Sequence, residues 1–127
     1  MPRLISFAMT KQQFRDRTKR VTRRLNWWTN KNGNRIVQVG DVLCGCEQVQ
    51  GRRGKPLVRM GLIKITKLRR ERLGLMCDDL VYGAREARLE GFPEMTGPEF
   101  VKFFCDSAGP SVNESTIVTR IEYEYLD

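Results

Sequence analysis

The sequence predicts an α+β domain in which helices gather around a mixed or antiparallel sheet that can curl into a small barrel. The chain has 127 residues, 40% of them hydrophobic, which is enough to bury the core of one domain spanning residues 1–127. Candidate elements occur in the order strand, helix, several strands, two helices and a strand, which is typical of an α+β fold. Apolar runs are too short for a transmembrane helix, and the N-terminal region has no secretory signal. We therefore expect no membrane partner and a cytoplasmic location.

The first quarter of the chain predicts two short strands and one helix. Leu4–Phe7 has the composition of a strand. Thr10 and Gln13 have the spacing of a capping box, which predicts a helix that ends near Thr18. The segment 21–25 then has strand character.

The next segments predict a loop followed by a set of strands. The asparagines and glycine of residues 26–33 are typical of a loop, and this loop carries two tryptophans. Residues 36–49 predict a strand, a turn at Gly40–Asp41 and a new strand. The basic and glycine-containing segment 50–56 predicts a turn between strands. Partial alternation in residues 57–72 predicts one long bent strand or two short ones.

The second half of the chain predicts two amphipathic helices and a strand. Either aspartate of the Asp78–Asp79 pair can cap a helix that ends before Gly91. The segment Thr96–Glu99 has the residues of a capping box at the start of the next helix. Alternation in Ile117–Leu126 predicts the final strand.

Positive charge is concentrated in the first half of the chain. Residues 1–72 contain 19 basic and 4 acidic side chains, whereas residues 73–127 contain 4 basic and 11 acidic ones. In one domain this split predicts a basic face and an acidic face, and a basic face attracts polyanions by counterion release. Nucleic acid is therefore the favoured partner. The alternative is general solvation together with attraction between the two halves.

The chain contains no histidine and four cysteines: Cys44, Cys46, Cys77 and Cys105. The lack of histidine excludes Ser-His-Asp and Cys-His catalysis and histidine-ligated metals within one chain. The Cys-Gly-Cys sequence also lacks the CxxC spacing of a zinc ribbon. We therefore expect reduced thiols that are mostly buried, and neither a metal nor a cofactor.

Short motifs along nearly the whole chain resemble those of the ASCH domains of the PUA-like superfamily, a type common in bacteria and their phages. The motifs are Ile5–Phe7, Lys19–Arg24, Val39–Leu43, Gly61–Thr66, Glu90–Gly91, Thr96–Phe104 and Ile121–Tyr125. The resemblance implies a small PUA-like β-barrel, mixed or antiparallel, with flanking helices. It also implies a cleft that binds RNA or a modified nucleoside.

Some small proteins of similar design are amidohydrolases that remove the acyl group from N4-acetylcytidine with a lysine, a threonine and a glutamate. Their K-x-x-T motif matches Lys19 and Thr22, the arginine that follows matches Arg24, and the glutamate matches Glu90. The sequence departs from that pattern because it has no glycine before the lysine and has insertions after the motif and after the glutamate. For an enzyme, the resemblance implies Lys19, Thr22 and Glu90 as catalytic residues.

The chemistry of these three residues is consistent with that role. A lysine that is partly buried among cations can have a pKa low enough to activate a threonine hydroxyl. Glu90 can pass a proton to a leaving amine. The alternative is that Lys19, Arg20, Arg23 and Arg24 form a solvated or phosphate-binding patch, that Thr22 is an ordinary strand residue and that Glu90 pairs with an arginine of the basic half. A ribonuclease would have to use Lys19 and Glu90 as its acid and base.

Other residues are candidates for contact with nucleic acid. Trp27 and Trp28 lie among cations and can stack on bases, or one of them can cap the core. Tyr82 can line the cleft or pack in the core. The predicted set of ligand contacts is Lys19, Arg20, Arg23, Arg24, Trp27, Trp28, Arg52, Arg53, Lys55 and Tyr82. The sequence predicts no particular oligomeric state.

Overall fold

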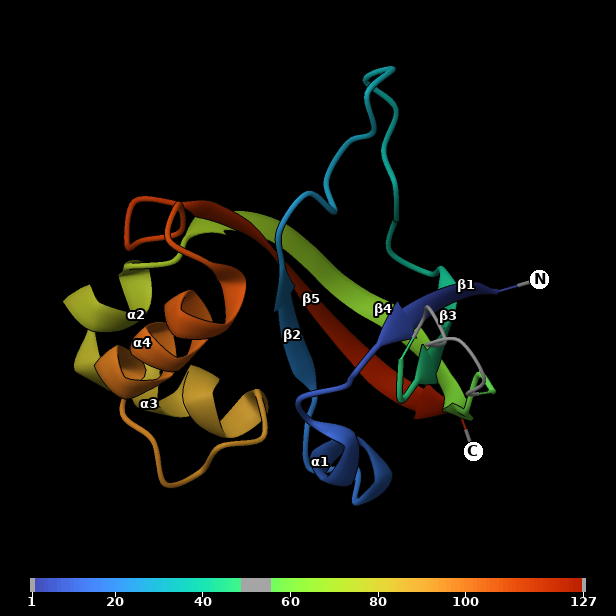
Figure 1. Cartoon of the computed structure of the whole chain (residues 1–127), viewed down its shortest axis with the longest axis horizontal. Helices are drawn as coiled ribbons and strands as arrows, with labels where there is room; N and C mark the ends of the chain where they lie inside the picture. The colour runs from blue at the N-terminus through green and yellow to red at the C-terminus, as the bar shows by residue number, and fades with distance from the viewer. Residues whose placement is uncertain (1, 49–55, 127) are drawn as a thin grey trace.

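The computed structural model describes residues 2–48 and 56–126, and in this part of the chain it contains five strands and four helices (Figure 1). In chain order they are β1 (Arg3–Ser6), α1 (Lys11–Arg15), β2 (Val21–Arg24), β3 (Val42–Cys46), β4 (Arg59–Arg72), α2 (Leu75–Asp78), α3 (Leu80–Leu89), α4 (Gly97–Ala108) and β5 (Ile117–Leu126). The predicted α+β class is confirmed. None of the helices in these residues is long and apolar enough to cross a membrane.

The strands form one mixed sheet in the order β1-β3-β4-β5-β2. β1 pairs with β3 in parallel, and the other neighbours are antiparallel. Irregularities between Gly45 and Cys46 and between Ile65 and Lys67 shift the register, and such bulges bend strands. The long strands β4 and β5 curve across the molecule, so the sheet forms a half-barrel with β1 and β2 as its two edges (Figure 1).

Two hydrophobic cores lie on either side of β2. The first fills the curled sheet and contains Ile5, Phe7, Phe14, Val37, Leu43, Ile63, Ile65, Ile121 and Tyr123. The second lies where α2, α3 and α4 gather at one end of the sheet, and it contains Leu73, Met76, Ala87, Phe92, Phe100, Val101 and Val118 (Figure 1). The edge strand β2 therefore runs between two separately packed parts of the fold.

The helix starts in the second half match the sequence prediction. The Asp79 side chain accepts hydrogen bonds from the main-chain N–H groups of Val81 and Tyr82 and so caps α3. Thr96 and Glu99 form the reciprocal bonds of a capping box at α4. The long bent strand and the final strand are also present, as β4 and β5.

The first helix is shorter than predicted. It ends at Arg15 rather than near Thr18, and the Thr10 side chain makes no capping bond. Arg17 has a φ of 63°, in the left-handed region that interrupts a helix. The chain then turns directly into β2.

The strand predicted just before the turn at Gly40–Asp41 is absent. Residues 26–41 instead form a long loop that projects from the sheet, joined by an isolated bridge between Thr29 and Arg35 (Figure 1). Val37 is buried in the barrel core, so its apolar character reflects packing rather than strand pairing. The sequence also gave no indication of the four-residue helix α2, whose N-cap is Gly74 and which lacks a side-chain cap.

Close packing of the helices makes Gly83 sensitive to substitution. A Cβ atom at this position would lie 2.1 Å from the Met76 carbonyl oxygen and 2.9 Å from the Gly97 Cα. We expect Gly83→Ala to lower the free energy of unfolding by about 1–3 kcal/mol, measured by urea denaturation. The control Ala84→Ser changes an exposed position of the same helix and should have an effect within about 0.5 kcal/mol. Equal stability of the two variants would show that the helices do not meet at Gly83.

Candidate functional site

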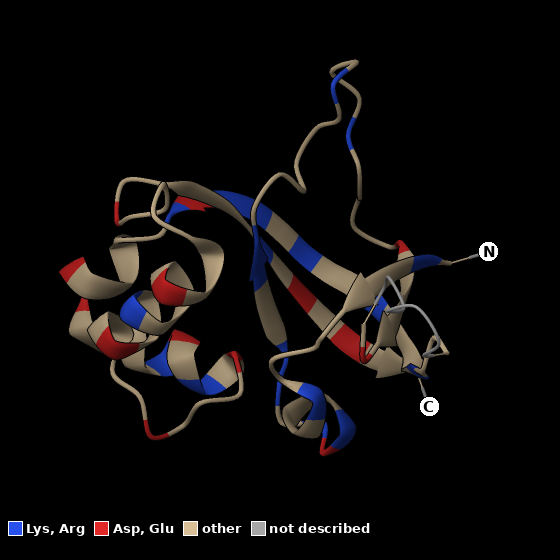
Figure 2. Ribbon diagram, viewed as in Figure 1, with Lys and Arg blue, Asp and Glu red and all other residues tan. Residues whose placement is uncertain are grey.

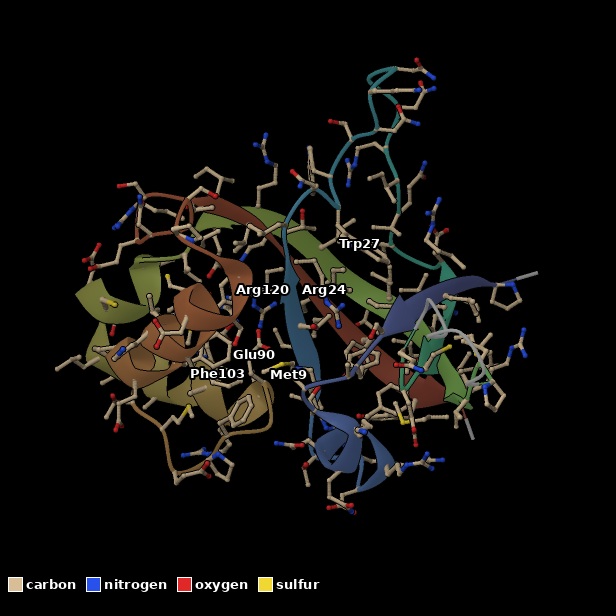
Figure 3. All side chains as sticks on the ribbon, viewed as in Figure 1. Met9, Arg24, Trp27, Glu90, Phe103 and Arg120 are labelled. Atoms are coloured by element: carbon tan, nitrogen blue, oxygen red, sulfur yellow. The ribbon has the colours of Figure 1, made fainter. Side chains whose placement is uncertain are left out.

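A pocket of about 310 Å³ lies along β2, between the start of the chain and helix α4. Its polar lining includes Lys19, Thr22, Arg24 and Glu90, which the sequence resemblance had matched to one motif. Its apolar lining includes Met9, Leu25, Phe92, Phe100, Phe103 and Phe104. In Figure 3, Glu90 and Phe103 lie on the helical side of β2, and Arg24 lies on the barrel side. The pocket therefore has a charged part and an aromatic part.

Lys19 and Glu90 form a buried ion pair at this pocket. The Lys19 Nζ donates to Glu90 Oε1 at 2.8 Å and to the Glu90 main-chain oxygen at 2.9 Å. Lys19 lies two residues before the start of β2 and Glu90 directly follows α3, so this contact joins the barrel to the helices. Burial lowers the pKa of Lys19 although the Glu90 carboxylate acts to raise it.

The turn after Glu90 requires a glycine. Gly91 has a φ of 102°, and a Cβ atom there would lie 2.8 Å from Gln13 Cγ and 3.5 Å from Lys19 Cβ. A side chain at this position would push against α1 and the base of Lys19. Gly91 thus lets Glu90 approach the lysine closely.

Arg24 brings a second cation to the pocket. Its Nε donates to Thr22 Oγ1 at 3.0 Å and its Nη2 to the Ser6 main-chain oxygen at 2.6 Å, and the guanidinium lies over the ring of Phe7. Burial lowers the pKa of Arg24 to about 10. No carboxylate within the described residues forms an ion pair with Arg24. Its charge is therefore available to a ligand with an acceptor or anionic group.

Glu90 is held in place by a buried network behind the pocket. Arg23 donates to Glu90 Oε2 at 2.9 Å, to Glu71 Oε2 at 2.9 Å and to Glu86 Oε1 at 2.5 Å. Arg120 donates to both oxygens of Glu86, at 2.5 and 3.1 Å. Burial alone would raise the pKa of Glu86, but the bonds from Arg120 and the charge of Arg23 lower it to about 2. The network fixes the carboxylate that bonds Lys19.

The arginines predicted to form one solvated patch take three different positions. Arg23 is only 3% exposed, and its guanidinium faces carboxylates instead of solvent. Arg20 is exposed and does not line the pocket. Of these three arginines, only Arg24 lines the pocket and forms no ion pair with a carboxylate of the described residues. The alternative of one solvated patch formed by Lys19, Arg20, Arg23 and Arg24 is wrong, because Lys19 and Arg23 are buried in ion pairs with Glu90.

Trp27, Trp28 and Tyr82 do not line the pocket. Trp27 packs against the barrel core. This agrees with the alternative that one of the two tryptophans caps the core. The ring of Trp28 stacks against Arg35, whose Cζ lies 3.6 Å from the ring centroid. The Tyr82 hydroxyl donates to Glu71 Oε1 at 2.8 Å and accepts from Arg69. The predicted contacts Arg52, Arg53 and Lys55 lie outside the described residues.

Part of the opposite charge of the two halves of the chain is neutralised by ion pairs inside the molecule. Arginines of β2 and β5 pair with Glu86 of α3. Other cations remain exposed along β4, including Lys64, Lys67 and Arg70, and the basic stripe on this strand can be followed in Figure 2. A basic surface therefore exists, but it is separate from the pocket.

No metal-binding cluster of three or more His, Cys, Asp or Glu side chains occurs in residues 2–48 and 56–126. The four cysteines are free thiols, of which Cys44 and Cys46 are buried and Cys77 and Cys105 half-buried. Burial raises the pKa of Cys46, which keeps that thiol protonated at neutral pH.

The phenylalanine rings of α4 that line the pocket, called the phenylalanine wall below, were not identified from the sequence as part of a site. Phe100, Phe103 and Phe104 are three and four positions apart on α4, a spacing that is also typical of core packing. The burial of Arg120 was also missed, because alternation places it with Glu122 and Glu124 on the face of the strand predicted to be polar. That residue marks the buried network rather than the pocket.

Structural comparison finds a similar known protein. The chain matches the crystal structure of an ASCH domain from Lactobacillus crispatus JV V101 with a TM-score of 0.60. The two proteins are 18% identical, and the match covers 96% of this chain and 77% of that one. No family model and no curated protein matches the sequence. At this identity the comparison establishes the fold.

Proposed function

Because this chain has the PUA-like fold of an ASCH domain, we propose that its pocket along β2 binds a nucleoside, either as a modified nucleoside or as an unstacked nucleotide of RNA. The observation that carries the proposal is the combination of three cations, Lys19, Arg23 and Arg24, and a carboxylate with a wall of phenylalanine rings in one pocket of about 310 Å³. Pockets for small ligands have this size and this mixture of apolar lining with a few polar groups.

The two parts of the pocket fit the two chemical features of a nucleobase. A planar base gains stacking energy against aromatic rings such as Phe103. Its carbonyl oxygens are acceptors for Arg24, whose charge has no carboxylate partner in the described residues. The exposed cations of β4 and the stacked Trp28 add a surface on which an RNA backbone can lie. For RNA we therefore expect binding that weakens as salt rises.

Calorimetric titration with N4-acetylcytidine and with cytidine tests the proposal. We expect Arg24→Met to weaken binding by about tenfold or more, because it removes a charged donor to the ligand. Arg20→Met is the matched control, since Arg20 is exposed and outside the pocket, and it should change Kd by less than about twofold. Equal loss in both variants would point to general electrostatics, and the absence of nucleoside binding to the wild type would refute the proposal.

A second candidate function is amidohydrolysis of an N4-acylated cytidine. The observation that favours it is a lysine with a lowered pKa in the same pocket as Thr22 and Glu90. In this reaction neutral Lys19 accepts the Thr22 hydroxyl proton while Oγ1 forms a bond to the acyl carbon. The C–N bond then breaks, Lys19 returns the proton to N4 and cytidine leaves. Water finally hydrolyses the threonyl ester and releases the carboxylic acid.

The other polar groups have supporting roles in that reaction. Glu90 holds the Lys19 Nζ in the pocket. Arg24 donates to Thr22 Oγ1 and so stabilises negative charge on this oxygen as its proton leaves. Nζ bonds Glu90, and the substrate must bring Nζ and Oγ1 together, as is common for catalytic groups.

A further inference from the structure

The free edge of β2 carries main-chain groups that no strand uses. β2 is the last strand of the sheet, so it has a strand neighbour on one side only, β5. In an antiparallel pair, residues alternate between those that bond to the neighbouring strand and those whose N–H and C=O point away. The main-chain N–H of Tyr123 donates to the main-chain oxygen of Arg20, which shows that the even-numbered residues of β2 are those that bond to β5. Thr22 and Arg24 therefore bond to β5, and the N–H and C=O of Arg23 point outward.

The outward main-chain groups of Arg23 face the pocket. Thr22 and Arg24 extend from one face of β2, and Arg23 extends from the other, yet all three line the pocket. Figure 3 shows the same arrangement, with Arg24 on one side of the strand and Glu90 on the other. A pocket that receives side chains from both faces of an edge strand must lie against the edge itself.

These groups are buried and unpaired in the described part of the chain. Arg23 is 3% exposed, and no hydrogen bond of its main-chain N–H or C=O to another described residue is found. Buried main-chain groups without a partner are rare in folded proteins, because each loses its bonds to water. A molecule that enters the pocket can supply the missing partners.

We propose that the Arg23 N–H and C=O read the hydrogen-bonding edge of a nucleobase bound in the pocket. The inference rests on the proposed function and adds the atoms that would recognise the base. The N–H and C=O of one strand residue point the same way and pair with an adjacent acceptor and donor, as they do in a sheet. Cytosine offers this pattern with its N3 acceptor and its N4–H donor. The rings of α4 then hold the flat face of the base.

Main-chain recognition has a consequence for specificity. Substituting the side chains around the pocket would change affinity but would leave the donor and acceptor of Arg23 in place. A base that lacks the acceptor next to the donor would therefore be rejected by the wild type and by pocket variants alike. 3-Methylcytidine is such a base, because the methyl group occupies N3.

Nuclear magnetic resonance of the main-chain amides tests this inference, with Thr22 and Arg24 as controls within the same strand. In the free protein, the Arg23 amide hydrogen should exchange with solvent at least about tenfold faster than those of Thr22 and Arg24, which bond to β5. Saturating cytidine should shift the Arg23 resonance downfield and slow its exchange by about tenfold or more. 3-Methylcytidine should do neither.

Three results would overturn the inference, and they separate it from the proposed function. If the free protein protects Arg23 as strongly as Thr22 and Arg24, the edge of β2 is not free. If cytidine shifts the resonances of other pocket amides but leaves that of Arg23 unchanged, the pocket binds a nucleoside but the Arg23 main chain does not recognise the base. If cytidine and N4-acetylcytidine shift no pocket resonance, both the inference and the proposed function fail.

Discussion

Replacing Glu86 with alanine is expected to lower the free energy of unfolding by about 3–5 kcal/mol, the loss typical of breaking a buried ion pair. Glu86 is fully buried and accepts hydrogen bonds from both Arg23 and Arg120. Removing the carboxylate leaves two buried guanidinium groups with fewer acceptors. Urea denaturation followed by circular dichroism measures the change.

An exposed glutamate provides the matched control for Glu86. Glu124 lies on β5 with its side chain exposed, and Glu124→Ala should change the free energy of unfolding by no more than about 0.5 kcal/mol. If both variants unfold at the same urea concentration, the buried network does not stabilise the fold.

The same carboxylate makes stability depend on acid pH. The pKa of Glu86 is about 2 in the folded protein, and in the unfolded chain it is near 4.5, the ordinary value for glutamate. A lowered folded-state pKa means that the stabilisation is present above the unfolded value and is lost as pH falls toward 2. Glu86→Ala should therefore lack this part of the acid sensitivity of the wild type.

Lys19→Met should reduce the turnover of N4-acetylcytidine by at least about a hundredfold, as expected for loss of a general base. Methionine has a similar length and carries no proton acceptor of comparable basicity. Glu90 still accepts from Arg23 in this variant, so we expect the fold to persist and circular dichroism to confirm it. Lys11→Met, at an exposed lysine of α1, is the control and should retain full activity.

The pH profile of turnover gives an independent check on Lys19. The base must be neutral, so activity should rise with pH along a limb that lies below 10.5, the ordinary pKa of lysine, because burial lowers the pKa of Lys19. Unchanged turnover in Lys19→Met would rule out Lys19 as the base. If the wild type binds N4-acetylcytidine but does not hydrolyse it, the proposed amidohydrolase activity is wrong and the proposed nucleoside binding is retained.

Local sequence signals predicted those parts of the fold that depend on neighbouring residues. The caps of α3 and α4 were found because Asp79 and the Thr96–Glu99 box act within one helical turn. The strand Ile117–Leu126 was found from its alternation. The PUA-like fold that the short motifs implied is confirmed by the structural match.

The buried charges could not be predicted in the same way. Arg23 and Glu71 each stand in a run of charged residues, which usually indicates a solvated surface. Their burial depends on β2, β4 and α3 meeting in space, with Glu86 between two arginines. Only the resemblance to a known family placed Lys19, Thr22, Arg24 and Glu90 in one site. The phenylalanine wall became apparent only in the structure, where residues of α4 and β2 line the same pocket.

A crystal structure of the protein soaked with N4-acetylcytidine would show whether the pocket along β2 binds a nucleoside. We expect the nucleoside in the pocket along β2, with its base against Phe103 and its polar edge toward Arg24 and the main chain of Arg23. A nucleoside seated instead against Trp28 and Arg35, with the pocket empty, would contradict it.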